Sequence, residues 1–276
     1  MEVLVKQYVD NKIRALEEAG IEEASIDAWI LVEHITGLKK QDIIINPNIT
    51  FSESELGDLN YAFKMRAKRI PVQHITGVQE FMGHTFEVNN DVLVPRFDTE
   101  TVVEHALGFI NDGDSVLDMC TGSGCIAISI ALARDVMVTG VDLSKAAIAI
   151  ARKNAKNNNA DVKFVESDLF EHVNGKYDVI ISNPPYIRSE EIEKLMEEVR
   201  LHDPLMALDG GKDGLVFYKR IAIDAKKHLK DGGRLIFEIG YDQGEEIKDI
   251  MTKQGYKDVT VQKDLAGLNR IITAHL

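Results

Sequence analysis

The residues best suited to chemistry lie in SNPPYIRS (182–189), directly after YDVII, which has the pattern of a buried strand. Proline supplies no backbone N–H and fixes φ, so it ends a strand rather than extending it. An Asn-Pro-Pro-Tyr corner there would hold two acceptors rigidly, the Asn183 side-chain oxygen and the Pro184 carbonyl, with the Tyr186 ring beside them. Two acceptors fixed in this way could receive two N–H groups of one ligand and orient it. A plain strand-terminating turn is the alternative.

A second candidate group surrounds LDMCTGSGCIA, which places Gly122 and Gly124 between a predicted strand and a predicted helix. Glycine lets the backbone approach a ligand closely, and a helix N-terminus offers free N–H groups. Asp142 ends the next predicted strand about twenty residues later, where a carboxylate can accept both hydroxyls of a ribose. NAD and S-adenosylmethionine both carry that ribose, so the pattern predicts a nucleoside ligand without choosing between them. A tight turn and a strand-end carboxylate without any ligand remain open.

Asp168, in ESDLF, lies at the end of the third predicted strand. Its side chain and the next backbone N–H could read an adenine edge, with Phe170 against the ring. A helix N-cap is the competing interpretation of the same aspartate.

These groups need a scaffold that brings strand ends together, and the chain after about residue 114 alternates strand and helix patterns. The predicted strands are 115–119, 136–143, 162–170, 177–183, 234–240, 256–264 and 270–276, and the predicted helices are 124–135, 144–159 and 214–230. This alternation predicts an α/β fold with a doubly wound, mostly parallel seven-stranded sheet. Ligands of such folds bind at the carboxyl ends of the strands.

The segment before this sheet has a different texture. Residues 1–78 have helical patterns, including a Ser25 cap and a capping-box-like pair Ser52 and Glu55, and predict a small helical bundle. Residues 79–96 contain two β-rich runs around NND (89–91), which predict a hairpin linker, and 97–276 form the α/β domain.

Composition narrows the class of protein. The net charge of −13 argues against a protein that grips nucleic acid mainly through phosphates. The two cysteines, Cys120 and Cys125, are too few for a disulfide framework. We find no export signal, no apolar run long enough for a membrane span and no metal-ligand spacing, so we expect a cytoplasmic protein without a metal.

Seven segments together resemble the peptide chain release factor glutamine methyltransferases (the HemK/PrmC family) nearly from end to end. They are RIPVQHITG (69–77), FMGHTFEV (81–88), VLVPRFDTE (92–100), DMCTGSGCIAI (118–128), SNPPYI (182–187), DGGKDGL (209–215) and DLAGLNR (264–270). The resemblance implies a Class I (Rossmann-like) domain that moves a methyl group from S-adenosylmethionine to the glutamine side-chain amide in the GGQ motif of release factors, leaving S-adenosylhomocysteine. It also implies that the N-terminal domain helps to recognise the release factor, and that DNA is not bound directly.

The resemblance assigns roles residue by residue. Substrate-facing residues would be Asn183, Pro184, Pro185 and Tyr186, of which Asn183, Pro184 and Tyr186 would be catalytic. Cofactor-facing residues would be Asp118, Cys120, Thr121, Gly122, Ser123, Gly124, Asp142, Leu143, Asp168, Leu169 and Asn183. The family often has Gly at Cys120 and Pro at Phe97.

Two questions stay open after this assignment. The basic run KMRAKR (64–69) is either a solvated helix face or a contact with the release factor or ribosomal RNA. Adenine-N6 methyltransferases of nucleic acids share the Asn-Pro-Pro-Tyr corner, but they would need a basic groove and a base-flipping region, whereas this chain is acidic.

Overall fold

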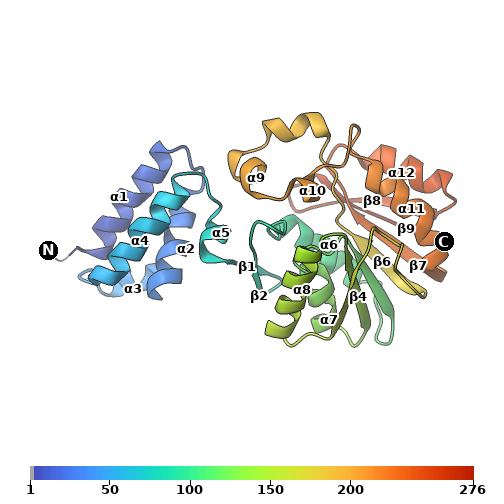
Figure 1. The fold of residues 1–276 in the computed structure, drawn as a ribbon, viewed down its shortest axis with the longest axis horizontal. Coiled ribbons are helices and arrows are strands. Elements are labelled where there is room, and N and C mark those ends of the chain that lie inside the picture. The colour runs from blue at the N-terminus through green and yellow to red at the C-terminus, as the bar shows by residue number, and fades with distance from the viewer. Residues whose placement is uncertain (1–2) are drawn as a thin grey trace. The chain divides into compact units, whose positions relative to one another are not determined.

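Two units make up the computed structural model, which describes residues 3–276 (Figure 1). The first unit runs to Gly77 and also includes Met196–His202. The second unit comprises Val78–Leu195 and Asp203–Leu276. Among the described residues, no helix combines the length and the apolar character that crossing a membrane requires.

The first unit is the predicted helical bundle. Its helices are α1 (Val5–Glu18), α2 (Ala24–Thr36), α3 (Lys40–Ile45), α4 (Glu53–Arg66), α5 (Val72–Thr76) and α9 (Glu197–His202). In α1, Val5, Tyr8, Val9 and Leu16 recur at helical spacing and are buried, so this face packs into the bundle.

The helix starts in this unit were only partly predicted. Ser52 and Glu55 form the expected capping box, with the Ser52 N–H donating to Glu55 Oε2 at 2.7 Å and the Glu55 N–H donating to Ser52 Oγ at 3.3 Å. The predicted Ser25 cap is wrong, because α2 begins at Ala24 after Glu23. Helices α3, α5 and α9 were not predicted.

The KMRAKR run is not a fully solvated face. Arg66 is buried and contacts Asp27 Oδ2 through Nε at 2.6 Å and Glu198 Oε1 through Nη1 at 3.1 Å. Arg69 also contacts Glu198 Oε1 at 3.1 Å. These ion pairs connect α4 with α2 and α9 inside the first unit, so two of the cations in this run are already neutralised.

The second unit has the predicted seven-stranded sheet, in the order β5-β4-β3-β6-β7-β9-β8. The strands are β3 (Ser115–Met119), β4 (Met137–Asp142), β5 (Val162–Glu166), β6 (Tyr177–Ser182), β7 (Leu229–Glu238), β8 (Lys257–Lys263) and β9 (Asn269–His275). The five neighbouring strands β5, β4, β3, β6 and β7 pair in parallel, whereas β9 is antiparallel to both β7 and β8. The order reverses at β3, which places a topological switch point between β3 and β6.

Helices cover both faces of this sheet, as predicted. They are α6 (Phe97–Leu107), α7 (Cys125–Ala133), α8 (Lys145–Asn157), α11 (Val216–His228) and α12 (Gly244–Lys253), with the shorter η1 (Ser189–Lys194) and α10 (Leu205–Leu208) in the connection after β6. Along β6, Val179 and Ile181 pack with α6, α7 and α8, whereas Ile180 packs with α11 and α12. Period-two burial on both faces is the expected result of a doubly wound sheet.

The hairpin occurs earlier in the chain than predicted. Strands β1 (Val78–Phe81) and β2 (His84–Glu87) enclose the two-residue turn Met82–Gly83, and the NND segment lies beyond the hairpin. Both turn residues have positive φ, 51° and 75°, as a type I′ turn requires. Phe81 and Phe86 are buried in the core beneath the sheet, so the hairpin packs against the second unit.

Candidate active site

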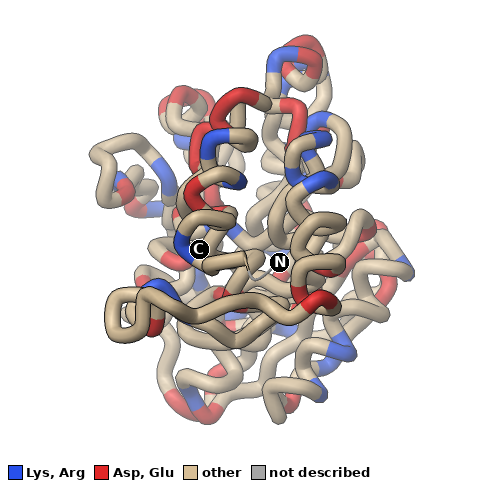
Figure 2. The backbone as a smooth tube through the Cα atoms, turned by 90° about the vertical axis from the view of Figure 1, so that its left-hand side faces the viewer, with Lys and Arg blue, Asp and Glu red and all other residues tan. Residues whose placement is uncertain are grey.

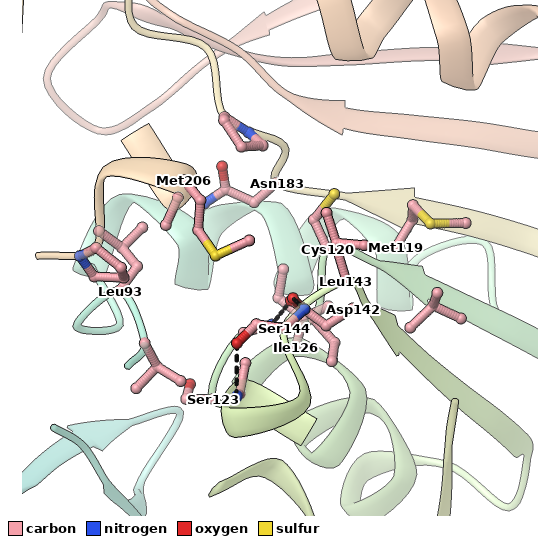
Figure 3. A pocket seen from close by; sticks show the side chains of 18 of the residues that line it. Leu93, Met119, Cys120, Ser123, Ile126, Asp142, Leu143, Ser144, Asn183 and Met206 are labelled. Carbon is pink, nitrogen blue, oxygen red and sulfur yellow. Dashed lines mark hydrogen bonds between the residues drawn. The ribbon is translucent and has the colours of Figure 1, made fainter. Parts of the chain in front are cut away.

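A cavity of about 560 Å³ lies at the carboxyl ends of β3, β4 and β6 in the second unit. That size fits a cofactor or small ligand. Figure 3 shows Met119, Cys120, Asp142 and Asn183 around it, with Met206 facing them from the connection after β6. The predicted cofactor and substrate segments therefore meet at one place, at the sheet edge where the fold predicts a ligand.

The loop between β3 and α7 forms one wall through its backbone. Cys120, Gly122 and Gly124 all have positive φ, at 63°, 53° and 82°. A Cβ on Gly122 would meet no atom within 4 Å, so open space lies beside this backbone. A Cβ on Gly124 would lie 3.1 Å from Ala151 Cβ, so this glycine serves the close approach of the loop to α8.

Asp118 supports that loop from below and does not line the cavity. It is fully buried, and its Oδ2 accepts hydrogen bonds from Thr121 Oγ1 at 2.5 Å and from the Ala127 N–H at 3.1 Å. Burial raises the pKa of Asp118 to about 7, against the lowering effect of these two hydrogen bonds. In this structure Asp118 supports the conformation of the loop through these two hydrogen bonds.

Asp142 is held in place by backbone donors. Its Oδ2 accepts from the Gly122 N–H at 2.9 Å and its Oδ1 from the Ser144 N–H at 2.8 Å. Burial raises its pKa, and these backbone hydrogen bonds oppose the rise. Each oxygen keeps a lone pair for a further donor. A fixed carboxylate at a strand end beside a glycine loop is the arrangement that can take the two hydroxyls of a ribose.

The other predicted cofactor residues divide into two groups. Leu143, Asp168 and Leu169 line the cavity, and Asp168 also pairs with Arg220 at 2.8 Å. No helix begins at Asp168, so the N-cap interpretation is wrong. Phe170 does not line the cavity, because its ring stacks on His228 at 4.8 Å. Phe217 lines the cavity instead, and no local sequence pattern points to it.

The Asn-Pro-Pro-Tyr corner follows β6 directly. Asn183 and Pro185 line the cavity, whereas Pro184 and Tyr186 are not among the lining residues. The Asn183 Nδ2 donates to Thr99 Oγ1 at 3.3 Å. The Tyr186 hydroxyl lies 3.4 Å from Glu238 Oε1, and burial raises the Tyr186 pKa well above its usual range.

The segment DGGKDGL (209–215) packs against the backbone of this corner. A Cβ on Gly210 would lie 2.7 Å from Tyr186 Cα and 2.8 Å from the Pro185 oxygen. The Ile187 N–H donates to the Leu208 carbonyl at 3.0 Å, and the Gly210 N–H donates to the Ile187 carbonyl at 2.8 Å. Only glycine permits this close approach at position 210.

Glu238 at the end of β7 and Thr99 on α6 were not predicted as site residues. Both are buried, and Thr99 Oγ1 donates to Glu238 Oε2 at 2.6 Å. Burial raises the pKa of Glu238 to about 7, the Thr99 hydrogen bond and Arg270 lower it, and Asp98 raises it further.

Three further ionisable side chains, those of Tyr186, Tyr218 and Cys125, are affected by the charge of Glu238. Tyr186 and Tyr218 each have a pKa raised first by burial, and the Glu238 charge adds to both shifts. Cys125 on α7 also has a pKa raised to about 12, mainly by burial, with a small contribution from the same charge.

Cys120 and Phe97, where the family often has Gly and Pro, both occupy positions whose backbone conformation suits the family's residue. Cys120 adopts φ of 63°, a conformation that glycine reaches without strain. Phe97 is the first residue of α6 and is exposed, and this first helical position is one that proline favours.

Comparison with known proteins adds independent observations. Residues 99–263 match the family model described as "Methyltransferase small domain", and residues 9–77 match the "PrmC N-terminal domain". Two similar relatives are each named release factor glutamine methyltransferase. The protein from Clostridium acetobutylicum is 38% identical, covering 99% of this chain and 97% of the relative. The protein from Bacillus subtilis is 41% identical, covering 94% and 93%.

The fold has a solved counterpart in a methyltransferase from Pyrococcus furiosus, with a TM-score of 0.56 and 20% identity over 81% of this chain and 98% of the other. In the described part of this chain, no three His, Cys, Asp or Glu side chains are grouped so that they could hold a metal ion.

Proposed function

The chain belongs to the family of release factor glutamine methyltransferases, and we propose that it methylates the glutamine side-chain amide in the GGQ motif of peptide chain release factors. S-adenosylmethionine is the methyl donor of this family, and S-adenosylhomocysteine is the product. The observation that carries the proposal is the meeting of Asn183 with the glycine loop and Asp142 around one cavity at the switch point of the sheet.

The residues assigned to the cofactor suit the three parts of S-adenosylmethionine, which are the ribose, the methionine and the adenine. Asp142 would bind the ribose hydroxyls, and the backbone around Gly122 would border the methionine part, since no side chain fills the space beside it. Asp168 and the Leu169 N–H would contact the adenine edge. The bound cofactor supplies a methyl group on a positively charged sulfur, which is a strong electrophile.

The substrate residues would act by orientation. An amide nitrogen delocalises its lone pair into the carbonyl, so it reacts only when the lone pair is aimed at the methyl carbon. The Asn183 Oδ1 and the Pro184 carbonyl would accept the two N–H groups of the glutamine, and Tyr186 would border its flat face. Positioning of this kind can lower a barrier by about 7–11 kcal/mol.

A protein amide suits this chain better than a nucleic-acid base. The net charge is −13, and Figure 2 shows Lys and Arg interspersed with Asp and Glu along the backbone rather than gathered in one long basic tract. Binding to phosphates depends on clustered cations, and Arg66 and Arg69 are already paired internally.

The first unit would contribute to recognition of the release factor. We also propose that the boundaries 1–78, 79–96 and 97–276 describe the functional parts, with residues 196–202 added to the first part. Because release factors act in translation, we place the protein in the cytoplasm.

Mass spectrometry of a release factor incubated with the protein and S-adenosylmethionine tests the proposal. We expect the mass of one methyl group on the GGQ glutamine, and none when that glutamine is replaced by alanine. Methyl label in DNA or RNA, with none in the release factor, would refute the assignment.

A further inference from the structure

Glu238 connects the two ends of the Asn-Pro-Pro-Tyr corner. One carboxylate oxygen, Oε2, accepts from Thr99 Oγ1 at 2.6 Å, and Thr99 in turn accepts from Asn183 Nδ2 at 3.3 Å. The other oxygen, Oε1, lies 3.4 Å from the Tyr186 hydroxyl. The Glu238 backbone is fixed as well, since its carbonyl accepts from Tyr218 at 2.8 Å.

The chemistry of these groups determines the direction of each hydrogen bond. An ionised carboxylate only accepts, so the single hydroxyl proton of Thr99 has to point toward Glu238. The Thr99 oxygen is then an acceptor toward Asn183, and only the NH₂ end of that carboxamide can donate to it. The Oδ1 end therefore turns away from Thr99.

We propose that Thr99 and Glu238 are positioning residues that select which end of the Asn183 carboxamide is presented to the substrate. The two ends of an Asn side chain have nearly the same shape, so packing alone does not choose between them. One orientation offers an acceptor to the glutamine N–H, and the reverse orientation offers a donor that would repel it. This inference rests on the proposed function, because it assigns to Asn183 the acceptor role given above.

Burial strengthens the selection. Thr99 is 3% exposed and Glu238 2% exposed, so water does not compete for their hydrogen bonds. The reverse orientation would bring the Asn183 oxygen against an oxygen whose proton already points to Glu238. A buried polar contact without a donor costs about 1–3 kcal/mol, which favours the acceptor-outward form about 5- to 150-fold.

The hydrogen bonds from Asn183 to Thr99 and from Thr99 to Glu238 are called the relay below. Thr99→Val tests the relay, because valine has nearly the same shape and lacks the hydroxyl. We expect kcat for methylation of the release factor to fall about tenfold, with unchanged calorimetric affinity for S-adenosylhomocysteine. Thr99→Ser restores the hydroxyl and should recover most of the loss. Thr101→Val, the same change on the same helix at a residue that does not line the cavity, is the matched control and should match the wild type.

A double-mutant cycle separates positioning from general packing. Thr99→Val should add no further loss of kcat in an Asn183→Ala background, since the group that it orients is then missing. An equal loss in both backgrounds, or failure of Thr99→Ser to recover turnover, would overturn the relay.

A readout without turnover keeps the test separate from the proposed function. The side-chain NH₂ signals of Asn183, assigned by their loss in Asn183→Ala, should shift in Thr99→Val and remain in place in Thr101→Val. Wild-type protein that methylates no release factor refutes the function, whereas unshifted Asn183 signals in Thr99→Val refute the relay.

Discussion

Replacing Glu198 with alanine should destabilise the first unit, although this residue lies 132 positions after Arg66 in the chain. Glu198 Oε1 accepts from Arg66 Nη1 at 3.1 Å, from Arg66 Nη2 at 3.2 Å and from Arg69 Nη1 at 3.1 Å. The side chains of Arg66 and Glu198 are 8% and 10% exposed, so this is a buried ion pair. Its removal would leave the Arg66 guanidinium with one carboxylate, that of Asp27, and a 3.4 Å contact with the Ile70 carbonyl.

The expected size of the effect follows from this burial. Removing one partner of a buried ion pair costs about 3–5 kcal/mol, because the remaining charge is left without compensation. Asp27 stays in contact with Arg66, and the 27% exposed Arg69 side chain can be hydrated, so we expect the lower value of about 3 kcal/mol. The neighbouring Glu197 is 55% exposed and 3.7 Å from Arg69, so Glu197→Ala should cost less than about 1 kcal/mol.

Urea unfolding followed by tryptophan fluorescence measures this difference in the intact protein. Trp29, the single tryptophan of the chain, lies on α2 and reports on the first unit. With a slope of about 1–1.5 kcal/mol per molar urea, Glu198→Ala should lower the midpoint by roughly 2–3 M relative to the wild type. Equal midpoints for Glu198→Ala and Glu197→Ala would show that residues 196–202 are not an integral part of this unit.

Three further predictions concern the cavity. Asp142→Ala should weaken S-adenosylmethionine binding about 10- to 100-fold in calorimetry, because hydrogen bonds to a charged group are lost, and unchanged affinity would contradict the ribose role. Asn183→Ala should lower kcat about 100-fold or more while cofactor affinity stays within about threefold, and equal losses in both would contradict the acceptor role. Because burial raises the pKa of Glu238 to about 7, turnover of the wild type should fall as pH decreases from 8 to 6, since the protonated carboxyl no longer fixes the Thr99 proton. The folded state holds that proton more tightly than the unfolded chain, so the contribution of Glu238 to stability decreases as pH rises from about 4.5 toward 7. Glu238→Gln should flatten the pH profile of turnover, and an unchanged profile would exclude Glu238 as its cause.

The sheet could be predicted because each central strand is marked locally. The runs SVLDM and YDVIIS are short, apolar and followed by Gly or Pro, and they form β3 and β6 side by side. The parallel arrangement then brings the residues after their carboxyl ends together, so the sequence alone predicts that Asn183 and the glycine loop lie at one site.

Other features depend on contacts that local patterns do not carry. Thr99 and Glu238 are 139 positions apart, and Glu238 occupies an ordinary apolar strand, FEIG, so neither stands out in the sequence. The hairpin was misplaced for a related reason. A positive φ at Met82 is uncommon for a residue with a side chain, whereas NND is a frequent turn signal.

The stiffness of the corner after β6 comes from distant parts of the chain as well as from its prolines. Each proline fixes one φ, which limits the conformations of the corner but does not anchor it in the fold. The anchoring comes from Gly210 against the Pro185–Tyr186 backbone and from Gln243 Nε2, which donates to the Tyr186 carbonyl at 3.0 Å. The placement of the corner therefore depends on Gly210 and Gln243, which follow Tyr186 by 24 and 57 positions, and the two prolines alone would give a turn that is rigid but poorly placed.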